Sequence, residues 1–202
     1  SVLDAAVLAT VARGKRVLEF GAGGSTQIFA QVAREVVTVE SDSNWVEITR
    51  HNVARILERE RRLDPTEPVG APVLFLDANV DLAIPRGPYD VVFIDSLPVT
   101  RPQCARMSFD LLADGGCMVF HDTRVSCIRE IVTTISGEFM MSVGSVMFDI
   151  HGSNLSSIVR GRAPAYENWN EVEEKLLWEI GLSEPPNDFI EIVNARIDRF
   201  FR

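Results

Sequence analysis

The sequence predicts an α/β domain with a Rossmann-like, doubly wound sheet whose strands are mostly parallel. Short apolar runs alternate with longer helical patterns over about the first 135 residues, which is the order of repeated βαβ units. The runs consist largely of Val, Leu, Ile and Phe, as expected for strands that helices cover on both faces. A glycine-rich turn follows the first run and opens a helix, where sheets of this kind bind ligands.

Each element is assigned from its own pattern. Asn44 is placed to cap the second helix, and Glu47 three residues later would complete a capping box. Loops rich in proline and glycine precede the third and fourth strands, and we interpret them as loops within one domain. Buried strands are predicted over residues 16–20, 35–39, 73–76, 89–94 and 117–120, and helices over residues 25–34, 45–62, 100–112 and 124–136.

The last part of the chain follows a different pattern. Two strand-like runs, residues 139–150 and 155–159, are joined by a hairpin-like turn, which predicts an antiparallel pair that closes the sheet. Two amphipathic helices are expected further on. We therefore expect one domain over residues 1–163, with a C-terminal helical extension, residues 164–202, packed on it. We favour the interpretation that this extension covers the sheet edge; a homodimer contact or a substrate lid is the alternative.

Composition limits the partners and the setting. With 20 Lys and Arg against 29 Asp and Glu, the net charge is −9, which argues against a nucleic-acid partner. No apolar run reaches the roughly 18 residues of a membrane-spanning helix, and residues 1–12 lack the basic start of a secretory signal. Three separated cysteines, Cys104, Cys117 and Cys127, do not suit a disulfide framework or a paired zinc site. We expect a cytoplasmic protein that acts on a small molecule and has no membrane partner.

The turn after the first strand has the composition of a ligand cradle. Its glycines let the backbone turn sharply and leave bare main chain for a ligand, beside the free N–H groups of a helix N-terminus. Glu40 ends the second strand, twenty-one residues after Glu19, where its carboxylate can accept both hydroxyls of a ribose. Together these features predict an adenosine ligand.

Two residues indicate which adenosine ligand is bound. Thr26 stands where a dinucleotide site would have its third glycine. Glu19 lies two residues before the first glycine, Gly21, where a carboxylate would repel a diphosphate. A carboxylate suits a ligand with a positive amino group and a sulfonium, so we predict S-adenosylmethionine (SAM).

Five segments occur in an order shared with a known enzyme family. They are residues 17–24 (VLEFGAGG), 39–40 (VE), 76–78 (LDA), 89–95 (YDVVFID) and 111–116 (LLADGG). On these segments, residues 3–160 resemble a class I SAM-dependent methyltransferase; Ser25 departs from the pattern, because many members have a third glycine there. The resemblance implies a seven-stranded sheet whose last strand is antiparallel. The residues we assign to cofactor binding are Glu19, Gly21, Gly23, Gly24, Ser25, Glu40, Asp77, Ala78 and Asp95.

Three side chains are candidates for catalysis. Methyl transfer is an in-line displacement, so the protein supplies alignment and, for a hydroxyl acceptor, removal of a proton. Asp95, His121 and Asp122 end the fourth and fifth strands, at the sheet edge where ligands bind. His121 is the candidate base, with a hydrogen-bonded structural histidine as the alternative. Strand alternation would send His121 and Asp122 to opposite faces, so we expect at most one of them to face the acceptor.

A metal site at the two aspartates is an alternative to cofactor contact. Asp95 and Asp122 could converge on Mg²⁺, as in the similar catechol-type O-methyltransferases. Those enzymes follow the second aspartate with Asn, whereas this chain has Thr123. We therefore favour no resident metal, with Asp95 touching the cofactor and Asp122 capping the helix that follows.

The residues thus predict a SAM-dependent methyltransferase that transfers the methyl group to an oxygen of a small metabolite or a glycosyl acceptor. N-methyl transfer, another group transfer from an adenosyl ligand, and a non-catalytic SAM-binding module are the alternatives. Pro98 does not make the Pro-Pro-aromatic motif of methyltransferases that act on base amino groups, which again argues for a small molecule. Trp45 either lies over the adenine ring or anchors its helix in the core. Arg101 and Arg106 are either solvated or available to an acidic substrate.

Overall fold

A computed structural model describes most of the chain. The predicted C-terminal extension, residues 164–202, and half of the predicted hairpin turn, residues 151–152, lie outside the described part. The described residues are 2–63, 65, 70–79, 83–143, 145–149 and 153–161.

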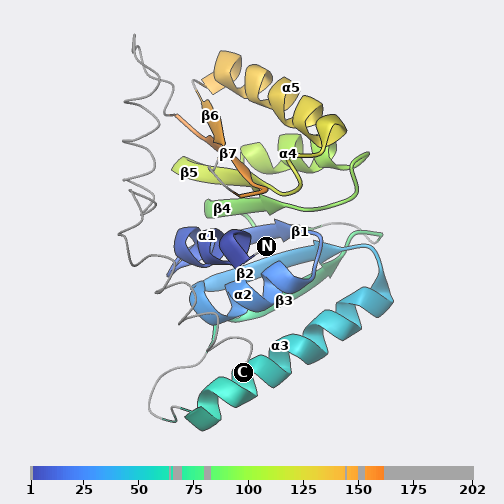
Figure 1. The fold of residues 1–202 in the computed structure, drawn as a ribbon, viewed down its shortest axis with the longest axis vertical. Coiled ribbons are helices and arrows are strands. Elements are labelled where there is room, and N and C mark those ends of the chain that lie inside the picture. The colour runs from blue at the N-terminus through green and yellow to red at the C-terminus, as the bar shows by residue number, and fades with distance from the viewer. Residues whose placement is uncertain are drawn as a thin grey trace.

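The described strands form one sheet of seven, in the order β3-β2-β1-β4-β5-β7-β6 (Figure 1). Neighbouring strands from β3 to β5 pair in parallel, and β7 runs antiparallel to both β5 and β6. The Rossmann-like fold with a mostly parallel sheet and an antiparallel last strand is therefore confirmed. The strands are β1 (Arg16–Phe20), β2 (Glu35–Glu40), β3 (Val73–Asp77), β4 (Tyr89–Ile94), β5 (Leu112–Phe120), β6 (Val146–Asp149) and β7 (Ser156–Val159).

Helices pack on both faces of the sheet. Alternate residues of a strand point to opposite faces, so Val17 packs with α1 and α2, whereas Leu18 and Phe20 pack with α4 and α5. α3 packs against α2. None of the described helices is long and apolar enough to cross a membrane. The helices are α1 (Val2–Ala12), α2 (Gly24–Val32), α3 (Ser43–Leu63), α4 (Arg101–Phe109) and α5 (Ser126–Val143).

The first helix, α1, has no counterpart in the sequence prediction. Its residues are apolar on nearly every side, so they lack the periodic polar face by which a surface helix is found. Val7, Leu8 and Val11 are buried in the core between α1, α2 and the sheet. Asp4 is the single acidic residue of the helix, and it is also buried. This single carboxylate in an otherwise apolar segment is the sequence feature that could have indicated that α1 carries part of a polar site.

The fifth helix is longer than predicted. α5 ends at Val143, so the prediction that a strand begins at residue 139 is wrong, and β6 begins at Val146. Phe139 stacks on Phe109 of α4 with ring centroids 3.6 Å apart, and both belong to the core beneath α4 and α5. This contact between distant residues favours the helix over the strand that local composition predicts. Gly137 lies within the helix, and a Cβ there would meet nothing within 4 Å, so packing does not require glycine at this position.

Other boundaries differ from the prediction by a few residues, among them the starts of α3 and β5. α3 begins at Ser43, and Asp42 rather than Asn44 caps it, because Asp42 Oδ1 accepts hydrogen bonds from the N–H groups of Asn44 (2.9 Å) and Trp45 (3.2 Å). β5 begins at Leu112 rather than at residue 117, because its pairing with β4 contains a register shift.

Candidate functional site

A cavity of about 440 Å³ opens where the carboxyl ends of β1, β2, β4 and β5 meet α1 and α2. Its volume lies within the range of small-molecule and cofactor sites. One side is polar main chain from the glycine-rich turn, and the other carries the side chains that end β4 and β5. Its lining residues are Asp4, Ala5, Leu8, Gly21, Ala22, Gly23, Gly24, Ser25, Ile28, Glu40, Trp45, Phe93, Asp95 and His121.

The glycine-rich turn requires glycine at its first position. Gly21 has a φ of +99°, and a Cβ there would lie 2.7 Å from the backbone oxygen of Asp95. The turn can therefore cross close to the end of β4. A Cβ on Gly24 would meet no other atom within 4 Å, so this glycine leaves open space beside the cavity. Gly23, Gly24 and Ser25, at the start of α2, all line the cavity, so a helix N-terminus borders it.

Glu19 lies behind the turn and does not line the cavity. Its side chain is fully buried, and the hydroxyls of Ser25 (2.5 Å) and Thr26 (2.6 Å) donate hydrogen bonds to its two carboxylate oxygens. Burial raises the pKa of Glu19 to about 7, although these two hydrogen bonds oppose the rise. Glu19, which the sequence assigns to cofactor binding, is therefore outside the cavity lining, and Ser25, which bonds to it, is in the lining.

Glu40 and Trp45 line the cavity and bond to the main chain of the glycine-rich turn. Glu40 Oε2 accepts a hydrogen bond from the N–H of Ala22 (3.1 Å), and its Oε1 accepts from the N–H of Ser41 (2.6 Å). This carboxylate therefore joins the end of β2 to the glycine-rich turn. The indole N–H of Trp45 donates to the backbone oxygen of Ala22, and the side chain is 46% exposed. Trp45 thus lies at the cavity and is not anchored in the core.

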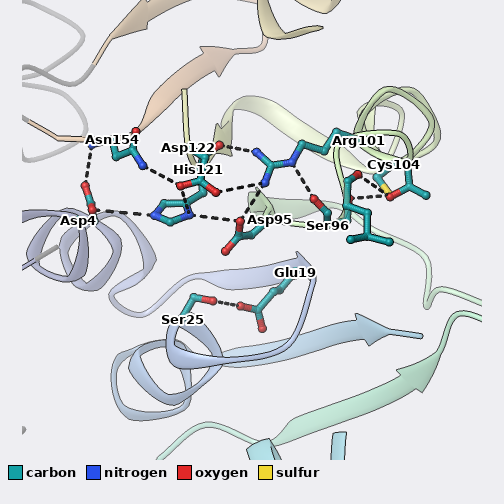
Figure 2. Close-up of polar contacts among 12 residues, drawn as sticks. Asp4, Glu19, Ser25, Asp95, Ser96, Arg101, Cys104, His121, Asp122 and Asn154 are labelled. Atoms are coloured by element: carbon teal, nitrogen blue, oxygen red, sulfur yellow. Dashed lines mark hydrogen bonds and ion pairs between the residues drawn. The ribbon is translucent and has the colours of Figure 1, made fainter. Parts of the chain in front are cut away.

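His121 is the centre of a polar cluster at the ends of β4 and β5 (Figure 2). Its Nδ1 lies 3.2 Å from Asp95 Oδ1 and 3.3 Å from Asp122 Oδ1. On the other side of the ring, Nε2 lies 3.9 Å from Asp4 Oδ2, which is longer than a hydrogen bond. The hydrogen bond to Asp95 is the main reason why the pKa of His121 is raised, and the charges of Asp95, Asp122 and Asp4 add to it.

Arg101 crosses this cluster from the first residue of α4 (Figure 2). Its Nη2 lies 3.1 Å from Asp95 Oδ1 and 3.7 Å from Asp122 Oδ2. Its Nε donates to the backbone oxygen of Ser96 (2.7 Å), and its Nη1 donates to the backbone oxygen of His121. The side chain is 4% exposed. Arg101 is therefore neither solvated nor free to bind an acidic substrate, the two roles expected from the sequence.

Asp122 lies behind His121 and outside the cavity lining. It has a φ of +59°, so the chain turns there, and strand alternation no longer separates His121 from Asp122. The amide of Asn154 donates to Asp122 Oδ1 (2.8 Å), so the carboxylate is directed into the polar cluster. Of the two residues, only His121 lines the cavity.

The last two sequence candidates, Asp77 and Ala78, also lie outside the lining. Asp77 Oδ1 accepts a hydrogen bond from the N–H of Asn79 (2.8 Å), and the N–H of Ala78 donates to the backbone oxygen of Glu40 (2.9 Å). Sequence reasoning missed Asp4, whose Oδ1 accepts from the N–H of Asn154 (2.8 Å) and which lines the cavity.

Solved structures share this architecture. The SAH-bound methyltransferase PaMTH1 of Podospora anserina matches with a TM-score of 0.58 and 16% identity, covering 79% of this chain and 78% of that one. The SAM complex of the O-methyltransferase TomG from Streptomyces achromogenes matches with a TM-score of 0.59 and 17% identity, covering 79% and 80%.

The fold of the present chain is that of the class I SAM-dependent methyltransferases. A third structure, the N-methyltransferase NodS from Bradyrhizobium japonicum in complex with S-adenosyl-l-homocysteine (SAH), matches with a TM-score of 0.54 and 14% identity, covering 79% and 85%. No family model matches the sequence, and no curated protein matches it. The methyltransferase fold places the glycine-rich turn and His121 on opposite walls of one cavity.

Proposed function

We propose that the protein is a SAM-dependent methyltransferase that transfers a methyl group to a hydroxyl oxygen of a small molecule. One observation carries the proposal: a single cavity has a bare glycine-rich turn on one wall and a histidine paired with a carboxylate on the other. The methyltransferase fold and the SAM and SAH complexes of the similar structures support it.

The residues of the turn fit SAM. Gly24 and Ser25 at the start of α2 line the cavity, and so does Glu40. The N–H groups of a helix N-terminus suit the carboxylate of SAM, and the carboxylate of Glu40 suits its ribose hydroxyls. Trp45 offers an exposed indole beside the glycine-rich turn, where an adenine ring can stack. Glu19 supplies negative charge behind Ser25 when it is ionised, which favours a cationic ligand. We propose no ligand contact for Asp77 and Ala78, which lie outside the lining.

His121 is placed to act as the base. SAM supplies an activated methyl group, so the protein has only to align the acceptor and remove its proton. The carboxylate of Asp95 accepts from Nδ1, which fixes the proton of the neutral ring there and leaves the Nε2 lone pair on the other side. Nε2 can then take the hydroxyl proton as the oxygen attacks the methyl carbon. Asp4, on the Nε2 side, stabilises the imidazolium that results.

Methyl transfer to nitrogen is the second candidate, and the similarity to NodS, an N-methyltransferase, favours it. An amine nucleophile needs its lone pair free of a proton, so the same base can serve it. The two reactions differ in how they depend on the base. A hydroxyl below its own pKa needs His121 to remove its proton, whereas an amine above its own pKa does not.

The test uses methyl-labelled SAM with matched hydroxyl and amine forms of small acceptors. We expect SAH to accumulate with a hydroxyl acceptor and labelled methyl to appear in the product. Transfer only to the amine forms would replace oxygen by nitrogen as the acceptor. If SAM binds and raises the melting temperature but no acceptor in the panel yields SAH, the protein is a SAM-binding module and the proposed activity is wrong.

A further inference from the structure

A group of side chains that resembles a metal site lies at the ends of β4 and β5. Asp95, His121 and Asp122 each offer a ligand atom, and these atoms all lie within 4.8 Å of one another. Carboxylate oxygens and an imidazole nitrogen are common ligands of divalent metals. The geometry of the three residues alone is thus compatible with a bound cation.

A guanidinium group already occupies the space between the two carboxylates. Arg101 Nη2 lies 3.1 Å from Asp95 Oδ1 and 3.7 Å from Asp122 Oδ2. Mg²⁺ binds oxygen at about 2.0–2.1 Å, so an ion held by Asp95 Oδ1 and Asp122 Oδ2 would lie against this nitrogen. An ion held by Asp95 Oδ1 and the other oxygen of Asp122 would still share Asp95 Oδ1 with Arg101. The Arg101 side chain is 4% exposed, so little water would screen the repulsion between the two positive charges. The residues present do not fit a divalent metal.

Arg101 is also held in place. Its Nε and Nη1 donate to the backbone oxygens of Ser96 and His121, at the ends of β4 and β5. A planar guanidinium can satisfy these acceptors and a carboxylate at once, which a point charge cannot do. Moving Arg101 aside for a metal would leave two part-buried carbonyl oxygens without these partners.

We propose that Arg101 is a built-in cation that takes the place of a divalent metal between Asp95 and Asp122. It neutralises the two carboxylates and, through Asp95 and the main chain of His121, positions the His121 ring at the cavity. Only the last consequence rests on the proposed function: methyl transfer by this protein proceeds without a metal, and Arg101 is a positioning residue in it. The exclusion of metal follows from the charge and the contacts of Arg101 alone.

The test compares two replacements of Arg101. Arg101→Met keeps much of the side-chain length and removes the charge, whereas Arg101→Lys keeps the charge without the fork. Binding of Mn²⁺ alone is measured by calorimetry and by electron paramagnetic resonance, after thermal unfolding has shown that each variant folds. We expect R101M to bind one Mn²⁺, with an affinity at least about tenfold greater than any Mn²⁺ affinity of the wild type or R101K. The wild type and R101K should show no stoichiometric binding. Asp122→Asn in the R101M background should abolish that binding.

Two results would overturn the proposal. One is stoichiometric Mn²⁺ binding by the wild type that Asp122→Asn removes. The other is a folded R101M variant that binds no Mn²⁺. Should R101M not fold, Arg101→Gln replaces it, because its amide can still donate to a backbone oxygen.

Mn²⁺ binding is read without SAM or an acceptor, so failure of the proposed methyl transfer leaves this result unaffected. If the activity is found, chelators should leave the turnover of the wild type unchanged.

Discussion

Replacing Glu19 with glutamine should make the folded protein less sensitive to alkaline pH. Burial raises the pKa of this carboxyl group from its ordinary value of 4.5 to about 7. Each pKa unit corresponds to about 1.4 kcal/mol, so ionising Glu19 costs about 3 kcal/mol more in the folded protein than in the unfolded chain. Glutamine has nearly the same shape and cannot ionise, so the variant does not incur this cost.

The sign of the effect follows from the two pKa values. Below about pH 4.5 Glu19 is protonated in both states and contributes nothing to the pH dependence. Between about pH 4.5 and 7 the unfolded chain releases the proton while the folded protein retains it, so stability falls as pH rises. Above about pH 7 both states are ionised and the loss is complete. The free energy of unfolding of E19Q, relative to the wild type, should therefore increase by about 2–3 kcal/mol between pH 5 and pH 8.

The measurement is urea unfolding of both proteins at the two pH values, followed by circular dichroism. Other titrating groups are common to both proteins, so their contributions cancel in the difference. Glu47→Gln is the matched control, because Glu47 lies on the surface of α3 with its side chain 70% exposed. This control should show the same difference from the wild type at both pH values. A pH-independent difference for E19Q as well would refute the argument that burial keeps Glu19 protonated.

Four further outcomes can be measured. Glu40→Ala should weaken SAM binding by about 1–3 kcal/mol in calorimetry, because charged hydrogen bonds are lost, while Glu47→Ala should not; equal affinities would count against the ribose assignment. His121→Ala should lower kcat far more than it weakens SAM binding, and comparable losses in both would make His121 a structural residue. The pH profile of kcat/KM should rise with a midpoint above 6.5, because the pKa of His121 is raised chiefly by its hydrogen bond to Asp95. Asp95→Asn should therefore move the NMR titration of His121 to lower pH, and an unmoved titration would contradict that cause. Phe139→Ala should cost about 3–5 kcal/mol of stability in urea unfolding, as expected for a buried aromatic residue, whereas a loss under 1 kcal/mol would contradict its place in the core.

The parallel part of the sheet could be predicted because its signals are local. A strand covered on both faces needs apolar side chains at consecutive positions, and this pattern is complete within residues 91–94 of β4. The glycine-rich turn is equally local: Gly21 must reach a positive φ and pass close to β4, and few other residues would allow it. Glu40 could be predicted as a site residue because it ends β2, at the sheet edge where ligands bind.

The elements that were mispredicted depend on contacts between distant residues. Phe139 belongs to a helix because it stacks on Phe109, and no pattern around residue 139 shows that partner. α1 was missed because an apolar helix that is covered on nearly every side has no amphipathic period. The sequence prediction therefore also missed the residues of α1 that line the cavity, Asp4, Ala5 and Leu8.

The charges of the candidate catalytic cluster also depend on residues that are distant in the sequence. The sequence places Asp95, His121 and Asp122 at neighbouring strand ends, where the pattern favours no resident metal but does not exclude one. The structure adds Asp4 from α1 and Arg101 from α4, which lie on opposite sides of the cluster. Arg101 supplies the positive charge that two adjacent carboxylates require, and Asp4 lies beside the ring nitrogen that Asp95 does not bind. Because these two residues decide between a cation site and a base, the chemistry at the end of β5 depends on tertiary packing and not on the residues of β5 alone.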